Sequence, residues 1–137
     1  MIDDFRNEYY FLSNFYPAPV TYNGLTYLNS EAAYQAQKTL DNREIFTKLT
    51  ASNAKRLGKH VYLRDDWDNI KDKIMFEIVK EKFLQNNYLK IKLLNTQNEE
   101  IVEKNYWNDT YWGTDLNYNG QNKLGKILMS IREMLKD

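Results

Sequence analysis

The chain has 137 residues, a formal net charge of zero, one histidine (His60) and no cysteine. Its length predicts a single domain, residues 1–137, with a hydrophobic core of its own. The absence of cysteine excludes a disulfide, a thiolate nucleophile and a zinc–sulfur site, and one histidine excludes a multi-histidine metal site. The balanced charge argues against a strongly basic nucleic-acid clamp. No apolar run reaches transmembrane length and no signal peptide is recognised, so we expect a cytoplasmic protein.

The first third of the chain predicts a hairpin followed by a helix. An aromatic, irregular stretch, Phe5–Pro17, comes first. The segments Val20–Tyr22 and Leu25–Tyr27 then flank Asn23-Gly24, a dipeptide typical of a type I′ β-hairpin. A helix is expected to run from Ser30 to about residue 40.

The stretch from Ser30 to Lys38 contains the side chains that are the best candidates for a ligand-binding or catalytic site. Ser30 is a suitable N-cap, and Glu31 would sit at the positive end of the helix dipole. Glu31 and Lys38 are seven residues apart and so share a helix face, with Tyr34 and Gln35 between them. A ligand lying over this face would meet an acid, an amide and an amine. A capped surface helix fits the same residues.

The remaining elements are predicted from the regular spacing of apolar residues and from residues that typically cap helices. Apolar residues at threes and fours indicate a long helix over Asp65–Asn86 and a last helix over about Gln121–Leu135, in which Gly125 allows close packing or close approach of a ligand. The other expected elements are two short helices over Arg43–Leu49 and Ser52–Gly58, a third over Tyr88–Leu94, and a possible strand over Glu100–Lys104.

The segment Asn105–Gly120 has no clean period but holds two tryptophans and three tyrosines. A loop this long within a domain is more often functional than idle. Asp109 in this loop is either a turn-forming residue or a group that acts on a ligand. Trp112, between Tyr111 and Gly113, is the best candidate for stacking on a flat ring.

Short motifs occur in one order along nearly the whole chain: Phe11–Pro17, Ser30-Glu31 with Gln35–Lys38, Asp66-Trp67 with Lys71 and Met75, Lys82-Phe83, Gln85-Asn86, Val102-Glu103, Asp109, Tyr111–Gly113, Gly120, Asn122, Leu124–Lys126, Leu128-Met129 and Arg132. This ordered set resembles the NADAR family, also called YbiA-like. Two places depart from the family pattern, Ala33 and Thr114-Asp115, and these departures affect the expected fit of the substrate.

The resemblance implies an α+β fold, predominantly helical, a YbiA-like single domain with one or two short β-hairpins. It also implies an N-glycosidase that cleaves the bond between ribose C1 and an exocyclic amine of a base, without metal or other cofactor. The expected partner is an ADP-ribosylated guanine, in a nucleotide or in DNA. The alternatives are a ribosylamino-pyrimidine phosphate of the riboflavin pathway, or a non-catalytic module that binds ADP-ribose or NAD. The oligomeric state is left open.

On this resemblance three side chains are expected to be catalytic. Glu31 would stabilise the positive charge that develops on the sugar and activate water. Lys38 would either form a Schiff base with the ring-opened sugar or hold a phosphate or hydroxyl as a cation. Asp109 would orient the base or act as a second acid–base group.

A larger set of residues is expected to bind the substrate in a cleft between the Ser30–Lys38 helix, the loop 105–120 and the segment Phe11–Pro17. This set comprises Ser13, Asn14, Phe15, Tyr34, Gln35, Trp67, Trp112, Gly113 and Asn122. Within it, Trp67 also fits the apolar stripe of the long helix, and Ser13 also fits a turn.

Overall fold

A computed structural model describes all of residues 1–137. The chain divides into two compact units, residues 14–87 and residues 1–13 with 88–137. The fold is α+β and predominantly helical, with one two-stranded antiparallel sheet, which confirms the predicted class. None of the helices combines the length and the apolar character needed to cross a bilayer.

In the unit 14–87, strands β1 (Pro17–Tyr22) and β2 (Leu25–Asn29) form the predicted hairpin. Asn23 and Gly24 connect them with φ angles of +50° and +85°, the positive values that a type I′ turn requires. Alternate residues of β1 are buried, as expected for a sheet with one covered face.

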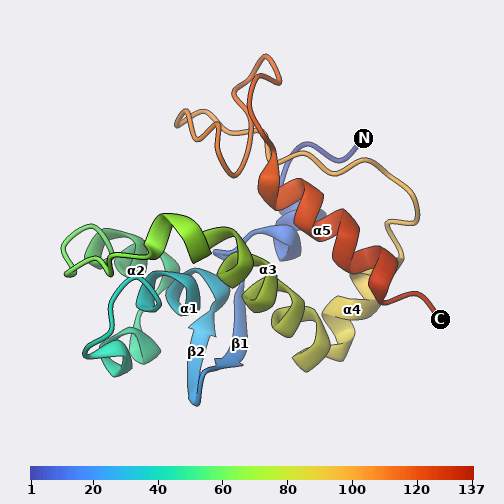
Figure 1. Ribbon diagram of the computed structural model, residues 1–137. Helices are drawn as coiled ribbons and strands as arrows, with labels where there is room; N and C mark the ends of the chain where they lie inside the picture. Colours follow the sequence, from blue (N-terminus) through green and yellow to red (C-terminus); the bar gives the residue numbers. More distant parts are fainter. The chain divides into compact units, whose positions relative to one another are not determined.

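Helix α1 (Ser30–Ala36) follows β2 directly and is the centre of this unit. All seven of its residues are buried. It packs against both strands, the 3-10 helix η2 (Arg43–Lys48), α2 (Ala51–Leu57) and α3 (Trp67–Gln85), as Figure 1 shows. The alternative of a capped surface helix is therefore wrong.

The caps of two helices differ from the prediction by one or two residues. Asn29 Oδ1 accepts the backbone N–H of Ala32 at 2.7 Å, so Asn29, and not Ser30, caps α1. Thr50, and not Ser52, caps α2 by accepting the backbone N–H three residues later. In each case two cap-forming residue types stand close together, and the one with extended backbone takes the cap position.

Helix α1 ends at Ala36, four residues earlier than predicted. The carbonyl oxygen of Lys38 accepts the backbone N–H of Arg64 at 2.8 Å, which takes it away from a continuing helix. The side chain of Gln37 donates to the carbonyl of Ala33 at 3.0 Å. The helix thus ends where a local side chain takes the Ala33 carbonyl and where, just beyond, a contact distant in sequence takes the Lys38 carbonyl.

Helix α3 (Trp67–Gln85) confirms the predicted long helix and buries one lysine completely. The side chain of Lys82 is 1% exposed, and its Nζ lies 5.8 Å from the centroid of the Tyr16 ring and 5.2 Å from that of Phe83. Burial lowers the pKa of Lys82 to about 7.

This lysine predicts an unusual dependence of stability on pH. Between about pH 7 and the ordinary pKa of 10.5, the unfolded chain holds a proton on Lys82 that the folded chain releases, so the free energy of unfolding rises with pH. We expect Lys82→Met to raise that free energy by roughly 1–3 kcal/mol at pH 7 and to remove the rise. Urea unfolding from pH 6 to 10 measures both. Lys73→Met, at an exposed position of the same helix, is the control; a less stable Lys82→Met protein at pH 7 would contradict the prediction.

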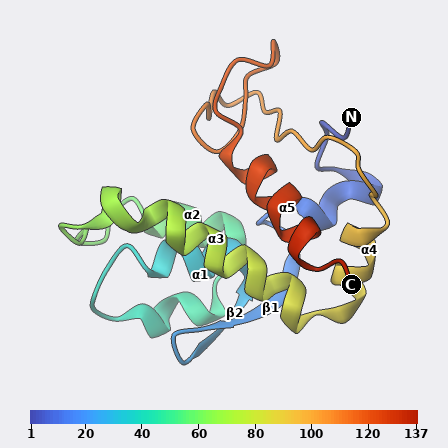
Figure 2. The ribbon, with the colours of Figure 1, turned by 45° about the vertical axis from the view of Figure 1, so that its right-hand side comes forward.

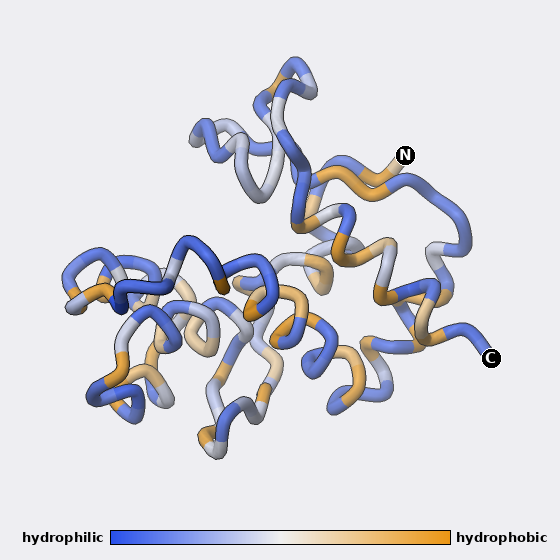
Figure 3. Tube along the Cα trace, in the orientation of Figure 1, coloured by the Kyte–Doolittle hydropathy of each residue, from blue (hydrophilic) through white to orange (hydrophobic).

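The unit of residues 1–13 and 88–137 contains η1 (Asn7–Leu12), α4 (Asn87–Leu94, of which Asn87 belongs to the other unit) and α5 (Lys123–Met134). Figure 3 shows the apolar positions recurring along α5, as its sequence predicts. Phe11 of η1 and Lys92 of α4 meet, with the Lys92 Nζ 5.6 Å from the ring centroid.

The predicted strand over Glu100–Lys104 is wrong. This segment makes only two isolated bridges, Ile2 with Ile101 and Lys104 with Thr114, because no extended neighbour lies along its full length. Gly125 has the close packing that was one of its two predicted roles, since a Cβ there would overlap the carbonyl oxygen of Ile101.

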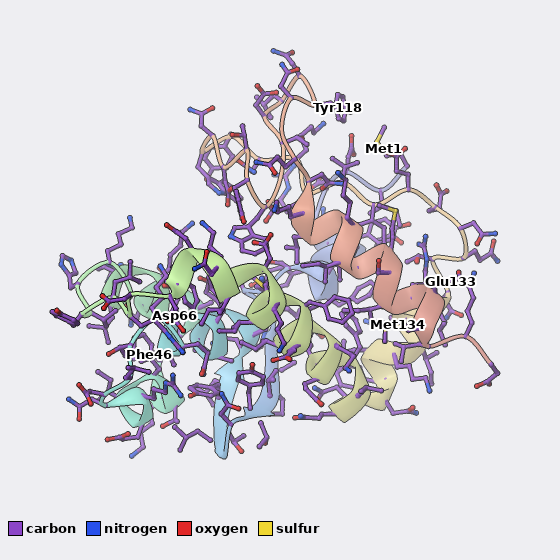
Figure 4. All side chains as sticks on the ribbon, in the orientation of Figure 1. Met1, Phe46, Asp66, Tyr118, Glu133 and Met134 are labelled. Atoms are coloured by element: carbon purple, nitrogen blue, oxygen red, sulfur yellow. The ribbon has the colours of Figure 1, made fainter.

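The loop between this segment and α5 contains neither helix nor strand (Figure 2). Tyr118, labelled in Figure 4, lies in this loop, and its hydroxyl donates to Asp3 Oδ2 at 2.6 Å. Lys104 pairs with the same carboxylate at 3.2 Å. These contacts fix the loop to the N-terminal segment of its own unit.

Candidate active site

Glu31 is a buried acid in the first turn of α1, with 8% of its surface exposed. Its backbone N–H donates to the carbonyl of Asn14 at 3.1 Å. The first turn of a helix carries partial positive charge on its unpaired N–H groups, which stabilises a carboxylate there. An acidic side chain is therefore held at a place where water has little access.

Gln35 lies one turn further along α1 and holds this carboxylate. Its Nε2 donates to Glu31 Oε2 at 2.6 Å. A hydrogen bond to a charged acceptor is stronger than one between neutral groups, so it fixes the carboxylate in one orientation. The other end of the amide, Gln35 Oε1, is buried and has no hydrogen-bond partner.

Asn14 and Ser30, both in contact with the start of α1, are hydrogen-bonded to each other. The Ser30 hydroxyl donates to Asn14 Oδ1 at 2.9 Å, and Asn14 Nδ2 donates to Met75 Sδ at 3.4 Å. The side-chain amide of Asn14 is thus used to attach its own segment to α1 and α3. Its predicted contact with a substrate stays a prediction.

Lys38 lies two residues beyond the end of α1, and its side chain is half-buried. Its ammonium group makes no ion pair and no side-chain hydrogen bond. Burial lowers the pKa of Lys38 below its ordinary value, the negative charge of Glu31 opposes this, and the positive charges of Lys59, Lys55 and Lys71 add to it. A larger neutral fraction of the amine favours a nucleophilic role over a purely cationic one.

Three of the predicted aromatic residues lie in the same unit. The rings of Tyr34 and Trp67 pack with their centroids 5.2 Å apart, and both residues are 5% exposed. Trp67 is thus part of the core, one of its two predicted roles. Phe15 is half-buried, with the Nζ of Lys55 5.8 Å from its ring centroid.

Asp109 belongs to the other unit and organises the aromatic loop. Its Oδ1 accepts the backbone N–H groups of Tyr111 and Trp112 at 3.1 and 3.0 Å. Its own backbone exchanges two hydrogen bonds with the side chain of Asn105. The turn-forming role predicted for Asp109 is therefore present, while Oδ2 makes no hydrogen bond within the chain.

Four further predicted residues have local roles in this unit. Trp112 is half-buried and meets Tyr111 edge-on, with ring centroids 5.0 Å apart. Gly113 has no room for a Cβ beside the carbonyl of Glu103. Asn122 is buried, and its amide donates to the carbonyl of residue 101 and accepts the N–H of residue 103. Ser13 follows η1, and its N–H closes the last turn of that helix.

Substitutions at Asp109 separate its structural and catalytic roles. Asp109→Asn keeps an oxygen that can accept both N–H groups, whereas Asp109→Ala leaves them without a partner. We expect the alanine variant to lose roughly 1–2 kcal/mol of unfolding free energy and the asparagine variant little. A catalytic Asp109 requires Asp109→Asn to lower kcat by about tenfold or more. Thermal unfolding measures the first effect and single-turnover kinetics the second. An unchanged kcat in Asp109→Asn would show that Asp109 forms the turn and has no catalytic role.

Comparison with known proteins shows which family the chain is similar to. The profile of the NADAR domain matches residues 3–136 of the chain. The chain belongs to the NADAR family. The solved structure of Escherichia coli YbiA superimposes with a TM-score of 0.85 at 34% identity, covering 98% of this NADAR chain and 86% of that protein.

Two relatives have names that state a function. The N-glycosidase YbiA of Shigella flexneri serotype 5b (strain 8401) is 37% identical over 134 residues, which cover 94% of this chain and 83% of that protein. A riboflavin biosynthesis protein of Vibrio vulnificus (strain YJ016) is 40% identical over 132 residues. Those residues cover 93% of this chain but only 36% of the Vibrio protein. The predicted enzyme class, an N-glycosidase, is confirmed at the level of the family.

The unit 14–87 brings together Glu31, Gln35 and Lys38 with Tyr34 and Trp67. Asp109, Trp112, Gly113 and Asn122 are gathered in the other unit. The predicted cleft that would unite both sets stays a prediction. Sequence reasoning missed Gly58, which lies against Gln35, and the sequence signal available was a glycine at the end of a short helix.

Proposed function

We propose that this protein hydrolyses the bond between ribose C1 and the exocyclic amine of a base, and that its substrate is an ADP-ribosylated guanine in a nucleotide or in DNA. The observation that supports the proposal most is the buried Glu31 carboxylate, held by Gln35 in the first turn of α1. Cleavage of such a bond develops positive charge on the sugar, and a preorganised carboxylate stabilises that charge without rearrangement.

Lys38 completes the proposed chemistry. When the sugar ring opens, the ring oxygen leaves C1 and takes a proton, and C1 becomes planar and carries a positively charged iminium group to the nitrogen of the base, which the Glu31 carboxylate stabilises. The neutral amine of Lys38 adds to C1, the base leaves as its free amine, and a Schiff base remains between Lys38 Nζ and C1. Water then adds to C1 and releases the sugar as an aldehyde and Lys38 as an amine. The net reaction consumes one water, and we assign its activation to Glu31 as a general base.

A group of positive charges supports a phosphorylated substrate. Lys55, Lys59 and Lys71 lie near enough to Lys38 to lower its pKa, and Arg56 is exposed on α2 between the first two. These cations come from α2, the residue that follows its C-cap, and α3, so they are spread over two helices. Two linked phosphates span such a spread better than one does, and we therefore favour the pyrophosphate of ADP-ribose, with or without a nucleic-acid strand, over a single phosphate.

The departures of Thr114 and Asp115 from the family pattern are a second reason for this choice, and the side chains of both residues form hydrogen bonds within the loop. The hydroxyl of Thr114 donates to the carbonyl of Asp115 at 3.0 Å. The carboxylate of Asp115 accepts the N–H groups of Asn117 and Asn119, both at 2.9 Å. Both side chains therefore have roles within the loop itself.

A ribosylamino-pyrimidine phosphate is the second candidate substrate. It is favoured by one specific observation, the name of the Vibrio riboflavin biosynthesis protein, which is 40% identical to this chain. Its phosphate would contact the same lysines, and its cleavage also breaks a bond between ribose C1 and an exocyclic amine.

One substrate panel tests the proposal. The purified protein is incubated with an oligonucleotide carrying ADP-ribosylated guanine, with a ribosylamino-pyrimidine phosphate and with NAD, and products are read by mass spectrometry. We expect release of ADP-ribose from the oligonucleotide. Cleavage of the pyrimidine alone would replace the first candidate with the second. Binding of ADP-ribose or NAD without cleavage of any of the three would overturn the enzymatic proposal and favour a binding module.

A further inference from the structure

Gly58 follows the last residue of α2 and is buried against the side chain of Gln35. Its backbone has φ −59° and ψ −20°, which every residue type adopts readily, so conformation does not require a glycine here. Space does. A Cβ at this position would overlap Gln35 Oε1 and lie 2.8 Å from Gln35 Cδ and 3.3 Å from the carbonyl oxygen of Ala54.

The orientation of the Gln35 amide is determined from its other end. A carboxylate only accepts hydrogen bonds, so the NH₂ group of Gln35 must face Glu31 Oε2, 2.6 Å away. Oε1 is then directed at Gly58. It is buried without a conventional hydrogen-bond partner, and a Cα–H group offers it only a weak contact. A buried acceptor left in this way costs stability, so neighbouring packing must hold it in place.

We propose that Gly58 is a positioning residue for Glu31: the end of α2 confines the Gln35 amide so that its NH₂ group stays on the carboxylate. Gly58 touches neither the carboxylate nor any reacting atom and acts through Gln35. The proposal rests on the role given to Glu31 in the proposed function. It adds that the orientation of the catalytic acid is controlled from a helix outside α1.

Kinetics of single and double variants test this chain of contacts. Gly58→Ala forces the amide to move, and a small misplacement of a catalytic group can cost about a hundredfold in rate, so we expect kcat to fall about tenfold to a hundredfold with a smaller change in KM. In a Gln35→Ala background no amide remains to be displaced, so Gly58→Ala should have little further effect. Ser52→Ala, on the exposed side of α2, is the control. An equal loss in both backgrounds would overturn the proposal.

A second readout does not depend on activity. The side-chain carboxyl of Glu31 is followed by ¹³C NMR as a function of pH. Loss of a donor destabilises the charged form of an acid, so we expect Gly58→Ala to move the titration midpoint to higher pH. Gln35→Met, which fills the space without a donor, should move it in the same direction, and it replaces Gly58→Ala if that variant folds poorly. A midpoint unchanged in Gln35→Met or in folded Gly58→Ala would overturn the inference.

The two readouts separate this inference from the proposed function. If the wild-type protein cleaves nothing in the substrate panel but Gly58→Ala moves the Glu31 titration, the proposed function fails and the contact chain stands. If the wild-type protein is active and neither kcat nor the titration responds to Gly58→Ala, the inference alone fails.

Discussion

Replacing Glu31 with glutamine is expected to lower kcat by about a hundredfold to ten-thousandfold and to leave substrate binding within a few-fold of wild type. The glutamine carbonyl can still accept the hydrogen bond from Gln35 Nε2, so the fold of α1 should persist. The negative charge that stabilises the sugar cation is lost. Single-turnover cleavage measures the chemical step, and isothermal titration of the variant with intact substrate measures affinity.

The matched control for this substitution is Glu44→Gln, at an exposed position of η2 in the same unit. It removes the same charge from the surface and should leave kcat unchanged. If Glu31→Gln cleaved substrate at the wild-type rate, the carboxylate would have no part in the chemistry. If it lost binding and cleavage equally, Glu31 would be a binding residue.

Lys38 should become covalently attached to the sugar during turnover. Borohydride added to a reacting mixture reduces a Schiff base, so we expect a stable sugar adduct that peptide mapping places on Lys38. Lys38→Arg keeps a positive charge, but its guanidinium stays protonated and cannot form the adduct. We expect this variant to show no trapping and a kcat lowered about a hundredfold or more. Nearly full activity in Lys38→Arg, with no adduct in wild type, would show that a cation suffices.

The dependence of this step on pH follows from the charges around Lys38. Only the neutral amine attacks C1, so kcat should rise with pH up to the pKa of Lys38, which burial lowers and the positive charge of Lys59 lowers further. Lys59→Gln removes that repulsion, raises the pKa of Lys38 and should shift the rising limb of the kcat profile to higher pH. Lys48→Gln, on η2 and not among the charges that act on Lys38, should leave the limb in place.

Local signals in the sequence predicted the elements that depend on local chemistry. Asn23-Gly24 predicted the hairpin because few other dipeptides adopt two positive φ angles easily. The regular spacing of apolar residues predicted α3 and α5 to within two residues at each end. Both kinds of signal concern residues close together in the chain.

The errors lie where distant contacts decide the structure. Beyond the end of α1 at Ala36, the carbonyl of Lys38 accepts the N–H of Arg64, which lies far along the chain, and so is not available to a longer helix. The segment 100–104 makes only isolated bridges because no extended neighbour lies along its full length, and the side chain of Asn122 bonds two of its backbone groups. The spacing of apolar residues and the helix or strand propensities of residues carry no information about such contacts.

The candidate site was predicted in part. The spacing of Glu31, Gln35 and Lys38 placed acid, amide and amine together, and the structure joins Glu31 to Gln35 directly. A glycine at the end of a short helix marked the position of Gly58 but not its contact with Gln35, which depends on how α2 packs against α1. The roles of these side chains in turnover stay predictions.

The most direct test of a sugar cation stabilised by Glu31 is the secondary isotope effect of deuterium at ribose C1, measured with wild-type protein in single turnovers. If C1 becomes planar and positively charged in the rate-limiting step, the deuterated substrate should react more slowly than the unlabelled one. Equal rates, or a faster reaction of the deuterated substrate, would contradict the account.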